Sequence, residues 1–353
     1  MRKYWPVLLS IVLMVASAGV FKTLLDAGAF DRVWDHPLPH CQVLPGLVGT
    51  EDLVQIPGTQ KVIISANDRA HIKPWSANGL YLYDLEQASR APVLLSGSTG
   101  LAWHPQGLSV WKEGEGEGQL IRVFAINHSD GSDKVEVMDL RGDALIPVRS
   151  IEFPGIRTLN ALVAIDSSSF YVSQDLGAQT SYGQLLEKYL RLPHGKVWLH
   201  RDGKTEVSAE GITFPNGLAL SPDQKYLYVA SMLDRSLLVF ERDPARLALT
   251  LKNSIFLDTA PDNLKWAPDQ RLLIGSQLHL LDLAAFAEDP LSHRSPSQVI
   301  AVGGLPDAAV IEEIYSSTGE MFSGVSTGLQ VGKYWLMGTG FGEGLLVCGS
   351  AED

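Results

Sequence analysis

The sequence predicts an all-β protein with a six-bladed propeller fold. Short strands recur in groups of three or four, and the groups are roughly 45 to 55 residues apart. Very little of the 353-residue chain has helical periodicity. About 310 residues remain after an apolar N-terminal stretch, which is enough for roughly six four-stranded blades. A β-sandwich would need fewer residues per sheet, and a parallel α/β fold would need helices that this pattern lacks.

The repeat is clearest in the stretches TFPNGLALSPDQKYLYVAS (213–231) and TAPDNLKWAPDQRLLIGSQ (259–277), and it is looser in AWHPQGLSVWKEGEGEGQLIRVFAINH (102–128). In each, proline followed by Asn, Asp or Gln precedes a short apolar run, a turn and an alternating strand. Further strands are expected over 79–87, 135–143, 196–204, 236–243 and 278–283.

One segment, QTSYGQLLEKYLRL (179–192), predicts a helix. Its apolar residues recur at the spacing of one helix face: Tyr182, Leu185, Leu186, Tyr189 and Leu190. The helix follows an expected strand, so it belongs on one face of the ring. It either packs over blade edges or forms a lid or apolar wall above a substrate pocket.

The N-terminal residues 1–30 are expected to be a separate export segment, followed by the propeller over residues 31–353. MRK is followed by the uncharged run WPVLLSIVLMVASAGVF, a basic start and an apolar core typical of export signals. Ala16-Ser17-Ala18 resembles a cleavage site, whereas residues 5–21 are just long enough for a retained membrane anchor. A cleaved segment predicts a periplasmic or extracellular protein, and a retained segment predicts a protein associated with the membrane through residues 5–21. A buried core helix is the remaining alternative.

Composition narrows the class of ligand. The chain is 45% hydrophobic and 19% charged, with a formal net charge of -12 and a pI near 5.2. Nucleic-acid binding needs a concentrated basic face, and the sequence offers none. A cation or a small neutral molecule is therefore the expected ligand.

The two cysteines, Cys41 and Cys348, lie near opposite ends of the chain. An even cysteine count in an exported protein favours a disulfide, which here would close nearly the whole chain into one loop. Two free buried thiols are the alternative.

Oxygen-bearing side chains occupy corresponding places in the repeats. The residues before each innermost strand gather near the axis of a propeller, so side chains remote in sequence can converge there. The candidates are Glu51, Asp52, Asn160, Asn216, Asp262 and Asn263. Five or six hard oxygen ligands favour Ca²⁺, and Glu51 with Asp262 would balance its charge. Alternatively, each asparagine simply forms a turn.

Over most of its length after the N-terminal segment, the sequence resembles the calcium-dependent paraoxonase and arylesterase family. The resemblance lies in LPHCQVLPGLVGTEDL, HPQGLSVW, INHSDG, LNALVAID, FPNGLALSPDQKYLYVA, PDN and the terminal cysteine. It implies a six-bladed propeller with an N-terminal hydrophobic segment and a disulfide between its first and last blades. It further implies a catalytic Ca²⁺ held by Glu51, Asn160, Asn216, Asp262 and Asn263.

The chain departs from that family at two places. The resemblance implies a second, structural Ca²⁺ held by Asp52 and the backbone carbonyl of Leu108, but Ala161 stands where the family has a third ligand, an aspartate. A weak or empty second site is therefore expected. The family's histidine pair matches His128, whereas its other member falls on Gln106, which cannot take a proton at neutral pH. A further pocket histidine of the family falls on Gln277.

The sequence therefore predicts a calcium-dependent hydrolase of carboxylic esters or lactones, of arylesterase or lactonase type. The metal would polarise the substrate carbonyl and His128 would assist water attack, with Gln106 orienting the water or the substrate. A calcium-binding propeller with weakened catalysis, acting as a binding or scaffold module, is the main alternative. Different chemistry on the same scaffold, as in strictosidine-synthase-like propellers, is a third.

Overall fold

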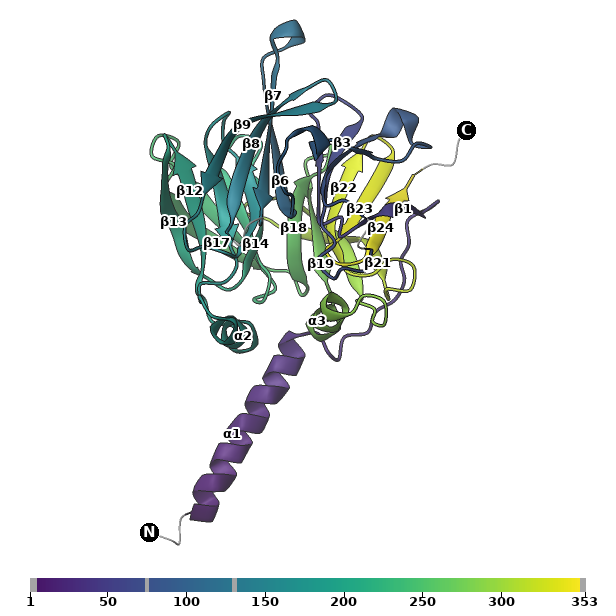
Figure 1. Ribbon diagram of the computed structural model, residues 1–353. Helices are drawn as coiled ribbons and strands as arrows, with labels where there is room; N and C mark the ends of the chain where they lie inside the picture. The colour runs from purple at the N-terminus through teal and green to yellow at the C-terminus, as the bar shows by residue number, and fades with distance from the viewer. Residues whose placement is uncertain (1–4, 74–75, 129–131, 350–353) are drawn as a thin grey trace.

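The computed structural model describes residues 5–73, 76–128 and 132–349. Within these residues the strands form six four-stranded antiparallel sheets arranged as the blades of a propeller (Figure 1). The predicted fold is therefore confirmed. Arg2 and Lys3, the basic start of the expected export segment, lie outside the described residues.

The first three blades along the chain have their strands in order from the innermost outward. The first contains β2 (Asp52–Gln55), β3 (Lys61–Ala66), β4 (Gly79–Asp84) and β5 (Val93–Leu94). The second contains β6 (Pro105–Glu113), β7 (Leu120–Asn127), β8 (Lys134–Arg141) and β9 (Ala144–Glu152). The third contains β10 (Leu159–Ala164), β11 (Phe170–Gln174), β12 (Gly195–Arg201) and β13 (Lys204–Ile212).

The other three blades follow the same order. The fourth contains β14 (Pro215–Leu220), β15 (Tyr226–Ser231), β16 (Ser236–Arg242) and β17 (Leu249–Phe256). The fifth contains β18 (Ala260–Trp266), β19 (Leu272–Gln277), β20 (Ser297–Gly303) and β21 (Val310–Ser317). The sixth contains β22 (Val325–Val331), β23 (Tyr334–Thr339) and β24 (Glu343–Cys348), and its outer strand is β1 (Gln42–Val48) from the start of the ring.

The two ends of the propeller are joined twice. Strand β1 pairs antiparallel with β24, with Gln42 opposite Val347. Beside this pairing, Cys41 and Cys348 form a disulfide across 307 residues of sequence, as expected. Because the last blade takes its outer strand from the beginning of the chain, the ring closes without leaving that blade one strand short.

The core lies between the blades. Each of six buried apolar clusters takes its residues from two neighbouring blades, including the cluster that joins the sixth blade to the first. Tyr171 and Tyr228, for example, are almost completely buried. The hydrophobic effect therefore stabilises the contact between blades as well as each sheet.

The connections between second and third strands carry the helices of the ring. Helix α2 (Ser181–Leu190) follows β11 and α3 (Leu280–Glu288) follows β19, and both lie on the same face of the propeller (Figure 1). Thr180 begins α2, because its side chain accepts the N–H of Gly183 at 3.1 Å. The helix predicted over 179–192 is therefore confirmed.

The strand predicted over 278–283 is wrong, because α3 begins at Leu280. Its sequence LLDLAAFAE is rich in leucine and alanine, which favour helix. Leu280, Leu283, Ala284 and Ala287 lie at helical spacing and line one cavity. An apolar run this short fits either period, so the sequence pattern alone does not separate a strand from a helix here.

The N-terminal helix α1 (Trp5–Asp26) extends away from the propeller on the same face as α2 and α3 (Figure 1). Residues Leu8–Asp26 have a mean hydropathy of 2.1 and are not buried in the protein, so this helix is long and apolar enough to cross a membrane. Its C-terminal end contacts the ring, because Asp26 pairs with Arg191 and the carbonyl of Ala27 accepts the N–H of Leu280.

Candidate metal and substrate site

Innermost strands from three blades carry four of the five expected ligands. Asn160 lies on β10, Asn216 on β14, and Asp262 and Asn263 on β18, while Glu51 immediately precedes β2 of the first blade. All five side chains are buried, with between 2% and 6% of their surface exposed. Residues up to 212 positions apart therefore meet at the axis, where the Asn263 side-chain amide donates to the Glu51 carbonyl at 3.2 Å.

The glycine after Asn216 explains how the inner strands come so close. A Cβ atom at Gly217 would lie 2.3 Å from the carbonyl oxygen of Asp262, closer than real side chains approach. At Gly107 a Cβ atom would similarly lie 2.7 Å from the Asn160 carbonyl. These positions require glycine because the neighbouring backbone fills the space that a side chain would need.

Two buried carboxylates at the centre share an environment that disfavours their charge. Burial raises the pKa of Glu51, although the nearby Arg69 guanidinium acts in the opposite direction. Burial raises the pKa of Asp262 well above its usual range, and the charge of Glu51 raises it further. A buried pair of like charges is costly unless a cation compensates it.

Several oxygens of this cluster are buried without a hydrogen-bond partner among the described residues. They include Oδ1 of Asn160, Asn216 and Asp262, and Oε1 of Gln277. The amide nitrogens have partners: Asn160 donates to Asp175 at 3.3 Å, and Gln277 donates to Asp262 at 3.3 Å. Buried oxygens without donors are what a hard cation such as Ca²⁺ would satisfy, so the residues present fit that ion.

The donor set consists of two carboxylates and three amides. Consistent with this composition, the described part of the chain contains no group of three or more His, Cys, Asp or Glu side chains that could hold a metal ion. Ca²⁺ accepts amide carbonyls as readily as carboxylates, whereas Zn²⁺ prefers histidine and cysteine.

Asp175 is a further buried carboxylate beside this cluster. It directly follows β11 and accepts the side-chain amide of Asn160. Burial raises its pKa to about 6. Its position at the end of a strand, in the motif YVSQD, was a sequence signal, but only the structure places it against Asn160.

Arg69 also lies against the candidate ligands. Its Nη2 is 3.2 Å from Oε2 of Glu51, and its guanidinium stacks over the ring of Phe341 at 5.4 Å. This arginine follows β3 in the same kind of connection that carries α2 and α3. No motif singled it out in the sequence.

His128 is held by two side chains. Its Nδ1 lies 2.6 Å from Oδ1 of Asp133, which is buried, and its Nε2 lies 2.7 Å from Oε1 of Gln106. The other oxygen of Asp133 accepts the N–H of Leu159 at 2.8 Å. The structure therefore brings His128 and Gln106 together, and Asp133 is a partner that the sequence did not suggest.

Asp52 and Leu108 also meet, but in a different way from the one expected. Leu108 contacts Asp52 through its backbone N–H, which donates at 2.8 Å, rather than through its carbonyl. The Nζ of Lys265 lies 2.7 Å from the other carboxylate oxygen. Ala161 is buried nearby on β10 and adds no charge.

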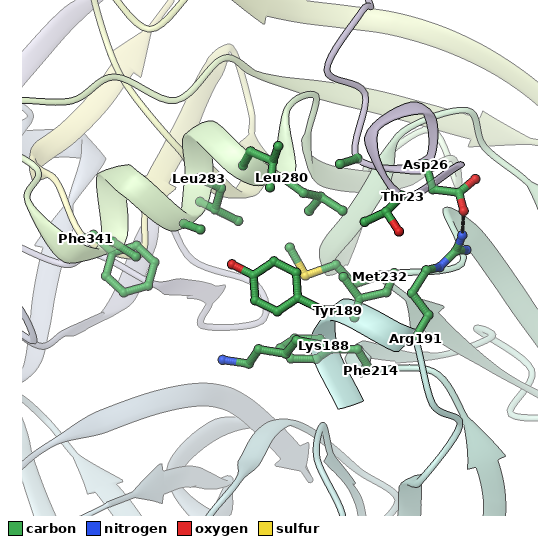
Figure 2. Close-up of a pocket in the computed structure, with 15 residues that line it drawn as sticks. Thr23, Asp26, Lys188, Tyr189, Arg191, Phe214, Met232, Leu280, Leu283 and Phe341 are labelled. Atoms are coloured by element: carbon green, nitrogen blue, oxygen red, sulfur yellow. Dashed lines mark hydrogen bonds and ion pairs between the residues drawn. The ribbon is translucent and has the colours of Figure 1, made fainter. Parts of the chain in front are cut away.

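An apolar cavity of about 250 Å³ opens beside the candidate metal ligands. It lies between the three helices, and its lining includes Tyr189, Phe214, Met232, Leu283 and Phe341 (Figure 2). The sulfur of Met232 lies 3.7 Å from the side-chain amide of Asn216, so the cavity borders the ligand cluster. Within α2, Lys188 and Tyr189 line this cavity. The other residues of its predicted apolar face are exposed: Tyr182, Leu185, Leu186 and Leu190.

The end of α1 completes one side of this cavity. Thr23, Asp26 and Ala27 line it. Arg191, the residue after α2, pairs with Asp26 (Figure 2) and also with Asp234 at 3.1 Å. The cavity combines apolar walls with a few polar side chains at one side, Thr23, Asp26 and Arg191 among them, and a small-molecule site usually has this form.

Comparison with known proteins identifies the lineage. The chain matches the arylesterase family over residues 33–349. Serum paraoxonase/arylesterase 2 of Bos taurus is 26% identical over 313 residues, which cover 86% of each chain.

Two solved structures have a similar fold. A luciferin-regenerating enzyme has a TM-score of 0.55 at 12% identity, covering 87% of this chain and 92% of its own. Regucalcin of Agrobacterium tumefaciens, a calcium-binding protein, has a TM-score of 0.51 at 14% identity, covering 89% of this chain and 97% of its own. The structural likeness is one of fold, whereas the family match spans nearly the whole propeller. The chain therefore belongs to the arylesterase family.

Proposed function

We propose that this protein is a calcium-dependent hydrolase of carboxylic esters or lactones. The observation that carries the proposal is the convergence of buried, unpartnered oxygens of Asn160, Asn216 and Asp262 beside an apolar cavity. Glu51 and Asn263 complete the donor set, and the family to which the chain belongs supports the class of reaction.

The five oxygen-bearing residues would hold a Ca²⁺ ion, which when bound supplies a Lewis acid for a substrate carbonyl oxygen. Glu51 and Asp262 supply two negative charges and the three amides add none, so the cluster neutralises one divalent ion. Phe214, Met232 and Phe341 present an apolar surface to the acyl or aryl part of a substrate and exclude water around it.

His128 is the residue we assign to proton transfer. A neutral imidazole that donates Nδ1–H to Asp133 leaves Nε2 as the ring atom that can accept a proton from water. Nε2 faces Oε1 of Gln106, which is also an acceptor, so the Gln106 amide has to turn or move aside before Nε2 can act in this way. Gln106 occupies the position next to Nε2, so the water must share or displace that contact. General-base catalysis contributes about 10² to 10⁴ in rate. If the Gln106 contact prevents His128 from acting as the base, we expect a hydrolase that is slower by up to this factor.

The test is hydrolysis of phenyl acetate and a panel of lactones by the purified protein, with and without EDTA. We expect turnover that EDTA removes and added Ca²⁺ restores. Asn216→Ala should abolish it, whereas Asn253→Ala, at an exposed position on β17 of the same blade, should not. Turnover that is unaffected by EDTA would contradict the role of the metal.

A second candidate function is a calcium-binding propeller with weakened catalysis, which acts as a binding or scaffold module. The contact between Gln106 and His128 favours it, because a glutamine cannot relay a proton. Bound Ca²⁺ without turnover on any ester would support this candidate. The Gln106→His variant also distinguishes the two candidate functions. A large gain in hydrolysis rate would show that the rest of the site is arranged for catalysis.

We propose further that residues 1–30 direct export and that the propeller over 31–353 acts outside the cytoplasm. The Cys41–Cys348 disulfide and the apolar helix α1 support this location. A retained helix would also hold the cavity face toward a membrane. Fractionation of cells that express the full chain, with the mass of the mature protein, tests both cleavage and membrane association.

A further inference from the structure

We propose that Lys265 is a built-in counter-ion for Asp52, so that the channel holds no second metal ion. The two side chains come from different blades: Asp52 begins β2 of the first blade, and Lys265 lies near the end of β18 in the fifth. The Nζ of Lys265 is 2.7 Å from Oδ1 of Asp52, and the two side chains are only 14% and 2% exposed. This inference concerns a different cation position from the five-residue cluster.

The carboxylate of Asp52 already accepts three donors from the protein. Oδ1 accepts the N–H of Leu53 at 2.9 Å in addition to Lys265, and Oδ2 accepts the N–H of Leu108 at 2.8 Å. A divalent ion would have to displace these donors. The ion would also lie close to the ammonium group of Lys265, and two positive charges repel each other strongly where water is excluded.

The charges at this place support the same conclusion. Asp52 and Lys265 together are neutral, and Ala161 contributes no further carboxylate. A divalent ion added to this pair would leave two uncompensated positive charges in a buried setting, which is unfavourable. The resemblance noted in the sequence implied a second Ca²⁺ at Asp52, and the residues present do not fit that ion.

The pair has a further effect on the neighbouring cluster. Asp52 directly follows Glu51 in sequence, so its carboxylate adds negative charge next to the candidate ligands. By neutralising Asp52, Lys265 limits the excess of negative charge beside the candidate ligands. The Lys265 side chain therefore supplies the positive charge that a second metal ion would otherwise supply next to Asp52.

A double-mutant cycle tests the pair on the full chain in the presence of EDTA. Breaking a buried ion pair leaves one charge unpaired, so Lys265→Met alone should lower the melting temperature by about 10 °C. Asp52→Asn in the same protein should recover a substantial part of that loss. Lys61→Met is the matched control, because its pair with Asp143 is exposed and should contribute little. A Lys265→Met protein as stable as Lys61→Met would overturn the proposal.

Metal counting provides the second measurement. Equilibrium dialysis with elemental analysis should find one bound Ca²⁺ per wild-type chain, and one more in the Lys265→Met, Ala161→Asp double variant. Two ions in the wild-type protein would overturn the proposal, and so would an unchanged count in a folded double variant. No bound ion in the wild-type protein would instead contradict the proposed hydrolase, and the stability cycle would still decide the role of Lys265.

Discussion

Asp133 connects His128 to the strand that carries Asn160. One carboxylate oxygen lies 2.6 Å from Nδ1 of His128, and the other accepts the N–H of Leu159, the residue before Asn160. The orientation of the imidazole is thereby tied to the inner strand of the third blade. A carboxylate behind a histidine fixes its tautomer and stabilises its protonated form.

Asp133→Asn should consequently lower kcat for ester hydrolysis by about 10²-fold, with a smaller change in KM, because it acts on proton transfer rather than on substrate binding. The pH profile of kcat should shift at the same time. Asp139→Asn is the control, since Asp139 pairs with Arg122 on a neighbouring strand of the same blade. An unchanged pH profile would reduce Asp133 to a purely structural role.

In the proposed site, Arg69 would compete with Ca²⁺ for Glu51. Its guanidinium lies 3.2 Å from the carboxylate and repels any cation that approaches the same oxygen. Arg69→Gln should therefore tighten Ca²⁺ binding by roughly 3- to 10-fold, equivalent to about 1 kcal/mol. Isothermal titration calorimetry measures this directly. Weaker binding in the variant would mean that Arg69 instead holds Glu51 in its ligand geometry.

The metal-free protein should lose stability as pH rises through the range set by Asp175. Its pKa is about 6 in the folded protein against a usual value of 3.8. Between these values the folded state holds a proton that the unfolded state has released, so the free energy of unfolding falls as pH increases and levels off above about pH 6. The difference between the folded and unfolded pKa values corresponds to at most about 3 kcal/mol.

Thermal unfolding in EDTA between pH 4 and pH 7 measures this slope. Asp175→Asn should flatten it, because the amide does not titrate. Asp202→Asn should leave it unchanged, because Asp202 lies in an exposed turn. An equal slope in wild-type protein and Asp175→Asn would assign the effect to other groups, such as Glu51 and Asp262.

The terminal disulfide should contribute strongly to stability. It closes a loop of 307 residues, and the chain-entropy model gives up to about 5 kcal/mol for very long loops. Cys41→Ser combined with Cys348→Ser should lower the melting temperature by about 10 °C or more. Reductant should lower the melting temperature of the wild-type protein by a similar amount and have no effect on the variant. Equal stability of the oxidised and reduced wild-type protein would contradict this expectation.

The sequence by itself determined the propeller and its six blades, whereas only the structure shows that β1 completes the last blade. Strand periodicity and turn residues are local signals, so stretches such as 213–231 and 259–277 identify repeats without tertiary information. Local signals gave a wrong prediction over 278–283. A strand was expected there, but the apolar run is too short to show a period and α3 begins within it. The residues expected at the axis could be named because the position of an inner strand within a blade is itself repeated.

Only the tertiary structure decided which side chains face one another across blades. Asp52 with Lys265 and Glu51 with Asn263 are contacts between the first and the fifth blade that no spacing in the sequence connects. Their contacts depend on how six separate sheets pack around one axis, and on glycines that let backbones approach closely. Local propensity acts within a strand, whereas the charge balance of the channel arises between strands that are distant in sequence.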